Sequence, residues 1–220
     1  MLSGKDTIVA CSSPPGRGAI STIRLSGDKS FSIIKKITKN KLKKQISVVK
    51  FPLDNDLFEK CVLTIFKSPN SYTGEDIVEI STHGNPLIVE EVIKQCLKSG
   101  AKIAKPGEFT LRAFLNNKLS LDQSEAVIEI INAKSKSSLK AAQNSLRGGL
   151  KTKISKIQDK LRETRVLVET LIDFVDEDVD IYIDEVIGKI NEFKYFFSSF
   201  NEDMKAYSSI SNDVKVVVIG

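Results

Sequence analysis

The first half of the chain alternates between short apolar runs and stretches with helical spacing. The short runs predict strands over residues 7–11, 20–27, 46–51, 60–66 and 75–81. Phe31, Ile34 and Ile37 recur every three residues and predict a helix capped by Asp28. A second helix is expected to begin near Pro86 and to end before Gly100. Strands and helices mix without a regular βαβ order, so the pattern predicts an α+β fold.

The second half of the chain has a different pattern. Residues 122–207 contain no proline, and their apolar residues keep helical spacing. Helices are expected over residues 122–133, over 137–174 with a break at Gly148 and Gly149, and over 181–207. Four phenylalanines form a stripe on the last helix that is typical of packing. Helices of this length often need partner helices from elsewhere in the chain or from a second subunit.

Composition places the chain among ordinary globular proteins. It has 220 residues, of which 41% are hydrophobic and 28% charged. We find no apolar run of about 18 residues and no signal core, which indicates neither a membrane span nor secretion and favours the cytoplasm. Cys11, Cys61 and Cys96 lie far apart without C-x-x-C spacing. This argues against disulfides and a zinc site, so the cysteines are interpreted as core thiols.

The net charge of +5 is unevenly distributed, because the first half is basic and the second half mildly acidic. Part of the excess comes from the run KKITKNKLKKQ at residues 35–45. Such a run can attract phosphates, but a solvated turn after a helix is the favoured interpretation. Nucleic-acid binding is not predicted from this run alone.

The run KVVVIG at residues 215–220 reads as a buried strand that ends in a glycine. A phosphate-binding loop begins in this way and continues as G-x-x-x-x-G-K-[ST]. Only the first glycine of such a loop falls within these residues. Gly220 is therefore expected to be the start of a nucleotide-binding domain that these 220 residues do not contain.

Four stretches, taken in order and spacing, resemble one family. They are DTIVACSSPPGRGAISTIRLSG, PNSYTGEDIVEISTHGNP, AKPGEFTLRAFLNNKLSLDQSEAVIEIINA and LVETLIDFVDEDVD. Together they resemble the MnmE (TrmE) family of tRNA-modification GTPases, over almost all of residues 6–220. The resemblance implies a mixed-sheet folate-binding and dimerising domain over 1–118, the first part of a helical domain over 119–212, and the first strand of a GTPase domain over 213–220.

The resemblance also implies a ligand and partners. The first domain is similar to part of the tetrahydrofolate-dependent aminomethyltransferases, and family folate contacts fall on Arg24, Glu79 and Lys118. The ligand would be 5-formyl- or 5,10-methylenetetrahydrofolate, bound by a homodimer. With the flavoprotein MnmG, the family modifies carbon 5 of the tRNA wobble uridine. GTP, Mg²⁺ and K⁺ belong to the GTPase domain, so these residues alone are not expected to hydrolyse GTP.

The remaining motifs are given mainly structural interpretations. PPGRG and YTGED are expected to be loops that shape the site or simple tight turns. His83 is interpreted as structural, and no catalytic or metal-binding residue is predicted. Asn85 replaces a family glycine and is expected to keep a left-handed turn. The acidic run at residues 173–180 favours a helix break, with Asp178 or Asp180 as a cap, over a metal site.

Two other functions remain open. The chain could be a noncatalytic scaffold whose helices dock a partner while the folate pocket is incomplete. It could also be a free-standing aminomethyltransferase, although the helical half and the start of a phosphate-binding loop have no place in such an enzyme.

Overall fold

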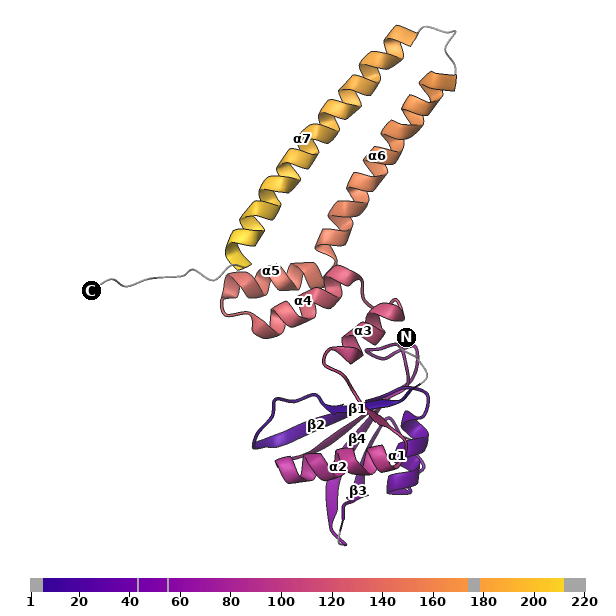
Figure 1. Cartoon of the computed structure of the whole chain (residues 1–220), viewed down its shortest axis with the longest axis vertical. Coiled ribbons are helices and arrows are strands. Elements are labelled where there is room, and N and C mark those ends of the chain that lie inside the picture. Colours follow the sequence, from indigo (N-terminus) through magenta and orange to yellow (C-terminus); the bar gives the residue numbers. More distant parts are fainter. Residues whose placement is uncertain (1–5, 43, 55, 174–178, 212–220) are drawn as a thin grey trace, which may run out of the picture. The chain divides into compact units, whose positions relative to one another are not determined.

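The computed structural model describes residues 6–42, 44–54, 56–173 and 179–211 (Figure 1). The chain divides into two compact units, Met1–Ser120 (unit 1) and Leu121–Gly220 (unit 2). Unit 1 contains a sheet with helices, and unit 2 contains helices in its described part. The α+β fold expected from the sequence is confirmed. The strand expected over residues 213–220 lies outside the described residues.

Unit 1 is built on a six-stranded mixed sheet with the order β3-β4-β5-β2-β1-β6. The strands are β1 Ile8–Cys11, β2 Gly18–Ser26, β3 Ile46–Pro52, β4 Phe58–Phe66, β5 Ile77–Gly84 and β6 Lys102–Ile103. Neighbouring strands pair antiparallel except β1 and β6, which are parallel. The helices are α1 Ser30–Thr38, α2 Pro86–Lys98 and α3 Glu108–Leu115.

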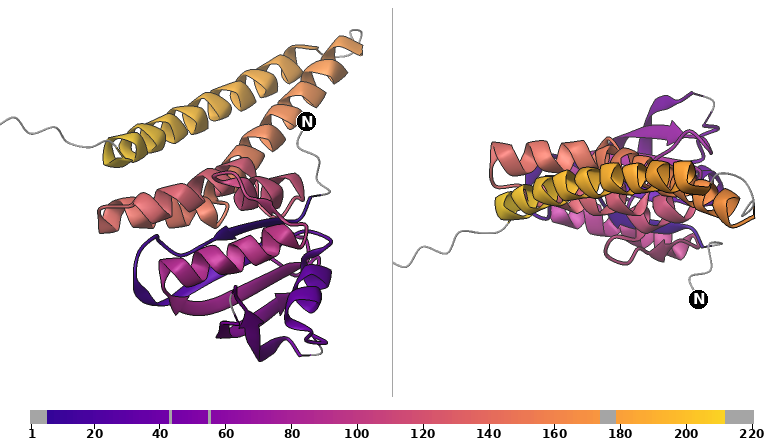
Figure 2. Two further views of the ribbon diagram at one scale, coloured as in Figure 1. Left: turned by 60° about the horizontal axis from the view of Figure 1, so that its bottom comes forward. Right: turned by 90° about the horizontal axis from the view of Figure 1, so that it is seen from above.

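Helices α1 and α2 cover one face of this sheet (Figures 1 and 2). Strand residues alternate between the two faces, so every second residue of β4 is buried, including Cys61 and Leu63. The core joins these residues to α1 and α2, and its members include Ile23, Ile34, Phe51, Ile80 and Val92. We call the opposite side of the sheet the open face; it carries Arg24 and Glu79.

Two local predictions in unit 1 are wrong in detail. Lys29, not Asp28, occupies the N-cap position of α1 and makes no side-chain cap bond. The start of α1 is held instead by Ser30 Oγ, which donates to the Gly27 carbonyl at 2.7 Å. Asn85 has an extended backbone, with φ −112°, and its side chain accepts the Leu87 N–H. Asn85 therefore acts as the N-cap of α2 and forms no left-handed turn.

Unit 2 contains α4 Leu121–Asn132, α5 Lys136–Leu146, α6 Gly149–Asp173 and α7 Val179–Ser211. Helices α6 and α7 lie side by side as a hairpin (Figure 1), and Lys160 Nζ lies 4.0 Å from the Glu192 carboxylate across it. The predicted break at Gly148 and Gly149 is confirmed. Residues 174–178 of the acidic run and the side chain of Asp180 lie outside the described residues. Within the described ranges, no helix is long and apolar enough to cross a membrane.

Candidate functional site

The centre of the candidate site is an ion pair on the open face of the sheet. Arg24 on β2 and Glu79 on β5 are direct cross-strand partners. Arg24 Nη2 and Nε donate to Glu79 Oε1 at 2.6 and 2.9 Å. The two side chains are 24% and 23% exposed, so the pair is partly open to solvent. Glu79 Oε2 accepts no hydrogen bond from any described residue, which leaves one carboxylate oxygen for a ligand.

Two aromatic rings flank the guanidinium of this pair. Arg24 Cζ lies 5.4 Å from the Tyr72 ring centroid and 5.6 Å from the Phe109 ring centroid. The Tyr72 hydroxyl is 2.9 Å from Thr110 Oγ1, which joins the β4–β5 loop to α3. Cation–π contacts at these distances hold the guanidinium in place. The site is therefore a charged pair beside two flat apolar surfaces.

A buried polar network holds the Tyr72 loop against α3. Arg112 Nη2 donates to Glu108 Oε1 at 2.9 Å, and Arg112 Nη1 lies 3.2 Å from both Glu75 carboxylate oxygens. Ser26 Oγ donates to Glu75 Oε2 at 2.7 Å and lies 2.7 Å from Thr73 Oγ1. Because Ser26 follows Arg24 by two residues on β2, the network fixes the two rings relative to the ion pair.

The charge of Glu108 is part of this network. Burial opposes ionisation of this carboxyl group, but the Lys105 backbone N–H and the Arg112 guanidinium outweigh burial and lower the pKa of Glu108. The carboxylate is therefore ionised at neutral pH, and Arg112 is balanced by two carboxylates.

Lys118 lies beside the same loop without touching the ion pair. Its backbone N–H donates to the Ala113 carbonyl at 2.8 Å, just after the end of α3. A Cβ added to Gly74 would lie 3.2 Å from Lys118 Cγ, so the glycine lets the lysine stem pack closely against the loop. Gly74 also has a φ of +77°, which favours glycine. The Lys118 ammonium has no ion-pair partner among the described residues.

One loop, residues 72–76, connects the three predicted site residues. The Tyr72 ring contacts Arg24, which pairs with Glu79, and Gly74 lies against the Lys118 stem. Sequence reasoning marked this YTGED loop as site-shaping but did not identify the ring of Tyr72. It also did not identify Phe109 or Arg112. For Phe109 and Arg112, the only sequence signal was their place in the quoted stretch AKPGEFTLRAFLNNK, because Arg24 and Glu75, which they contact, lie far away in the chain.

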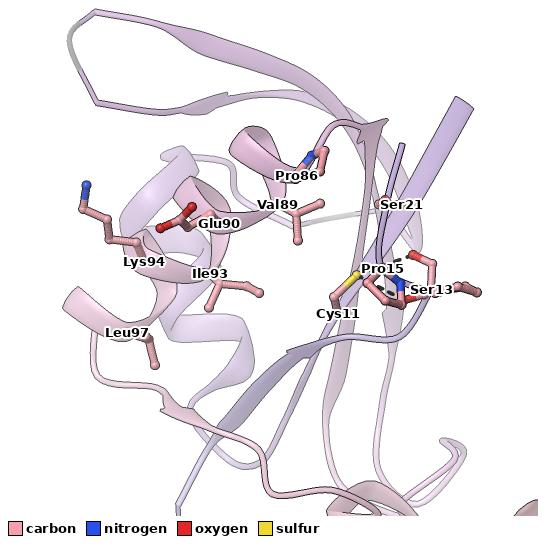
Figure 3. Close-up of a pocket in the computed structure, with 12 residues that line it drawn as sticks. Cys11, Ser13, Pro15, Ser21, Pro86, Val89, Glu90, Ile93, Lys94 and Leu97 are labelled. Carbon is pink, nitrogen blue, oxygen red and sulfur yellow. Dashed lines mark hydrogen bonds between the residues drawn. The ribbon is translucent and has the colours of Figure 1, made fainter. Parts of the chain in front are cut away.

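The PPGRG loop borders a different cavity, on the face covered by α2 (Figure 3). This cavity of about 600 Å³ lies between Pro14 and Pro15 of the loop and the α2 residues Val89 and Ile93. Cys11 also lines it and is half-buried, whereas Cys61 and Cys96 are fully buried core thiols. The loop does not reach the Arg24–Glu79 pair through this cavity, because the two lie on opposite faces of the sheet.

His83 has a structural contact. Its Nδ1 lies 2.7 Å from Glu59 Oε1, and its backbone N–H donates to the same oxygen at 3.0 Å. Glu59 is buried, whereas the His83 side chain is 74% exposed. The contact therefore holds the end of β5 against the start of β4. Among the described residues, no group of three or more metal-ligating side chains could hold a metal ion.

Comparison with known proteins identifies the class. Residues 7–118 match the family model described as GTP-binding protein TrmE N-terminus, and residues 121–215 match the MnmE helical domain. The tRNA modification GTPase MnmE of Francisella tularensis subsp. holarctica (strain OSU18) is 44% identical over 98% of this chain and 46% of the relative. The MnmE of Francisella philomiragia is 46% identical over 83% of this chain and 41% of the relative.

These matches define a class of tRNA modification GTPases. The chain belongs to the MnmE (TrmE) family. It spans about half the length of the curated relatives it matches.

Proposed function

We propose that unit 1 binds a reduced folate, 5-formyl- or 5,10-methylenetetrahydrofolate, with Arg24, Glu79 and Lys118. The observation that carries this proposal is the Arg24–Glu79 pair, with one free carboxylate oxygen beside the rings of Tyr72 and Phe109. A pterin presents neighbouring N–H donors, which suit a carboxylate acceptor. Its flat ring suits the adjacent aromatic faces. Lys118 supplies a cation for a carboxylate of the glutamate tail.

The folate site is tested by calorimetric titration of 5-formyltetrahydrofolate into the chain and into Glu79→Gln. We expect saturable binding that weakens at least about tenfold in the variant, because hydrogen bonds to charged groups contribute roughly 1.5–3 kcal/mol. Glu90→Gln is the matched control, since this exposed residue on α2 lines the cavity on the opposite face. Equal weakening in both variants, or none in either, would contradict the assignment.

The open face also supports pairing of two copies through unit 1. Ile46, Val48 and Phe58 are each more than half exposed on neighbouring strands β3 and β4. A second copy of the same face would bury this apolar surface next to the folate site. Light scattering after size exclusion is expected to give a dimer that Val48→Lys converts to monomer. Val166→Lys, at an exposed position on α6, is the control.

In the whole protein, the proposal assigns this chain to modification of carbon 5 of the tRNA wobble uridine. The relatives' identity as tRNA modification GTPases supports this assignment. The folate supplies the one-carbon unit, the flavoprotein MnmG is the partner, and the cytoplasm is the compartment. GTP hydrolysis, with Mg²⁺ and K⁺, is assigned to a domain outside these 220 residues.

A scaffold role is the second candidate, and unit 2 provides the observation that favours it. Apolar side chains on α6 and α7 remain at least half exposed, among them Val166, Ile172 and Phe197. Such a surface suits a partner helix. A folded dimer that binds no folate at millimolar concentration would favour this role over the folate site.

A further inference from the structure

A lysine-rich corner of unit 1 takes no part in the folate site. We define the lysine corner as six exposed residues, Lys35, Lys36, Lys39, Lys41, Lys44 and Lys67. The first five lie at the end of α1 and in the segment leading to β3, and Lys67 follows β4. None of the six has an ion-pair partner among the described residues. The corner is therefore a patch of one sign of charge without internal neutralisation.

Local hydrogen bonds order the described residues between the end of α1 and Leu42. Asn40 Oδ1 accepts the Leu42 N–H at 2.8 Å, and the Asn40 N–H donates to Thr38 Oγ1 at 3.3 Å. Leu42 packs its side chain against the hydrophobic core. Leu42 thus anchors the described part of this segment, up to residue 42, to the core, and the neighbouring Lys41 is exposed. The sequence favours a solvated turn for this run, and the packing of Leu42 against the core is an additional feature that the structure shows.

Lys44 and Lys67 border one cleft although they come from different segments. The cleft has a volume of about 560 Å³ and is also lined by the polar Gln45, Ser68 and Asn70 and by the apolar Leu42, Ile65 and Phe66. The ammonium groups of Lys44 and Lys67 and the side-chain amides of Gln45 and Asn70 suit one oxyanion of a larger polyanion, whereas the Ser68 hydroxyl already donates to the Gly74 carbonyl at 2.8 Å. The Asp76 carboxylate near this lining already accepts the Ser68 N–H at 3.0 Å. The remaining lysines extend the positive charge beyond the cleft.

We infer that the lysine corner binds the phosphate backbone of the tRNA, with one phosphate in the cleft between Lys44 and Lys67. The identity of the polyanion as tRNA rests on the proposed function; the surface rests on the contacts above. Lysines act as point charges on phosphates and position an RNA without reading its bases. An RNA fits better than a lipid surface, because the apolar residues that line the cleft, Leu42, Ile65 and Phe66, are buried or half-buried and offer no exposed side chain for insertion into a bilayer.

The experiment is fluorescence anisotropy of end-labelled tRNA with the chain at several KCl concentrations. The test variant is Lys44→Gln/Lys67→Gln, and the matched control is Lys151→Gln/Lys156→Gln, two exposed lysines on α6. Each lost phosphate contact reduces the salt slope by about 1 and the affinity roughly fivefold near 100 mM salt. We expect the test variant to bind about 25-fold more weakly. We expect the control to stay within about twofold.

Each outcome of this experiment decides the inference. Equal loss in both double variants would reduce the effect to net charge and overturn the assigned surface, as would unchanged binding in the test variant. Binding to phosphatidylserine vesicles through these lysines without binding to tRNA would replace RNA by a membrane surface and also overturn it. The test variant must still bind 5-formyltetrahydrofolate like the parent, so the inference and the folate site succeed or fail separately.

Discussion

Unit 1 and unit 2 differ in how they bury their apolar residues. In unit 1, strands β2 to β5 and helices α1 and α2 enclose a continuous core that includes the fully buried Phe51, Leu63 and Ile80. In the described part of unit 2, the buried hydrophobic residues are Ala126, Ala142, Ile157 and Val186. Tyr195 on α7 is 80% exposed. Unit 1 is thus stabilised by its own core, whereas unit 2 leaves apolar helix faces for another surface to cover.

The largest expected effect is the loss of a core side chain in unit 1. Phe51→Ala should lower the free energy of unfolding of unit 1 by about 3–5 kcal/mol, because a large cavity replaces a buried ring. Ile187→Ala, at a half-exposed position in unit 2, should cost less than about 1 kcal/mol. Hydrogen exchange of the buried amides of β4 and β5 measures the first change, and helical circular dichroism measures the second. Similar effects at both positions would contradict the contrast.

A slightly smaller effect is expected from the buried network beside the Arg24–Glu79 pair. Arg112→Met leaves the carboxylates of Glu75 and Glu108 without their cation, and removing one partner of a buried pair costs about 3 kcal/mol. Thermal unfolding of unit 1 measures this loss. Arg165→Met is the control, because Arg165 pairs with Glu169 on an exposed helix surface and should change stability by less than about 1 kcal/mol. If the two variants behave alike, the network contributes no more than a surface pair.

Two glycines offer the sharpest comparison between the units. A Cβ at Gly84 would lie 2.5 Å from the Gly18 carbonyl oxygen, so Gly84→Ala should separate β5 from β2 and destabilise unit 1 by about 2 kcal/mol. At Gly188, in the interior of α7, a Cβ would meet no atom within 4 Å. Gly188→Ala should therefore stabilise unit 2 by up to about 1 kcal/mol. Urea unfolding of each variant tests both signs, and a destabilised Gly188→Ala would show that α7 packs differently.

The smallest expected effect is a dependence on pH in the acid range. The pKa of Glu108 in the folded protein lies below its ordinary value of 4.5, so the folded state favours the ionised form. The resulting stability is present above pH 4.5 and is lost as the pH falls through the folded pKa. Glu108→Gln should flatten the decline in melting temperature between about pH 4.5 and 3. An unchanged slope would assign the decline to other carboxylates.

The sequence predicts the regular elements because their patterns are local. Alternation in residues 60–66 and the start of α2 at Pro86 both follow from neighbouring residues. The helix α3 and the two-residue strand β6 were not predicted, since β6 is too short to show a period. The cap of α1 was assigned to the wrong residue partly because Thr7, whose hydroxyl accepts the Lys29 N–H, reaches the start of α1 only through the tertiary structure.

The candidate site shows the same limit. Arg24, Glu79 and Lys118 were identified from the family resemblance, and no local pattern distinguishes them from ordinary strand or helix-end charges. The pairing of Arg24 with Glu79 depends on the register of β2 and β5, which are separated by more than 50 residues. The rings of Tyr72 and Phe109 reach Arg24 from a loop and from α3. Only the folded sheet shows that these groups form one site.

The central proposal is that unit 1 binds a reduced folate and that unit 2 does not. Thermal unfolding followed at residues of each unit by NMR tests it directly, with and without 5-formyltetrahydrofolate. At a hundredfold excess over Kd, the ligand should stabilise unit 1 by about 2.7 kcal/mol and leave unit 2 unchanged, and Glu79→Gln should lose about half of this shift or more at the same concentration. A shift confined to unit 2, or an equal shift in Glu79→Gln, would contradict the account.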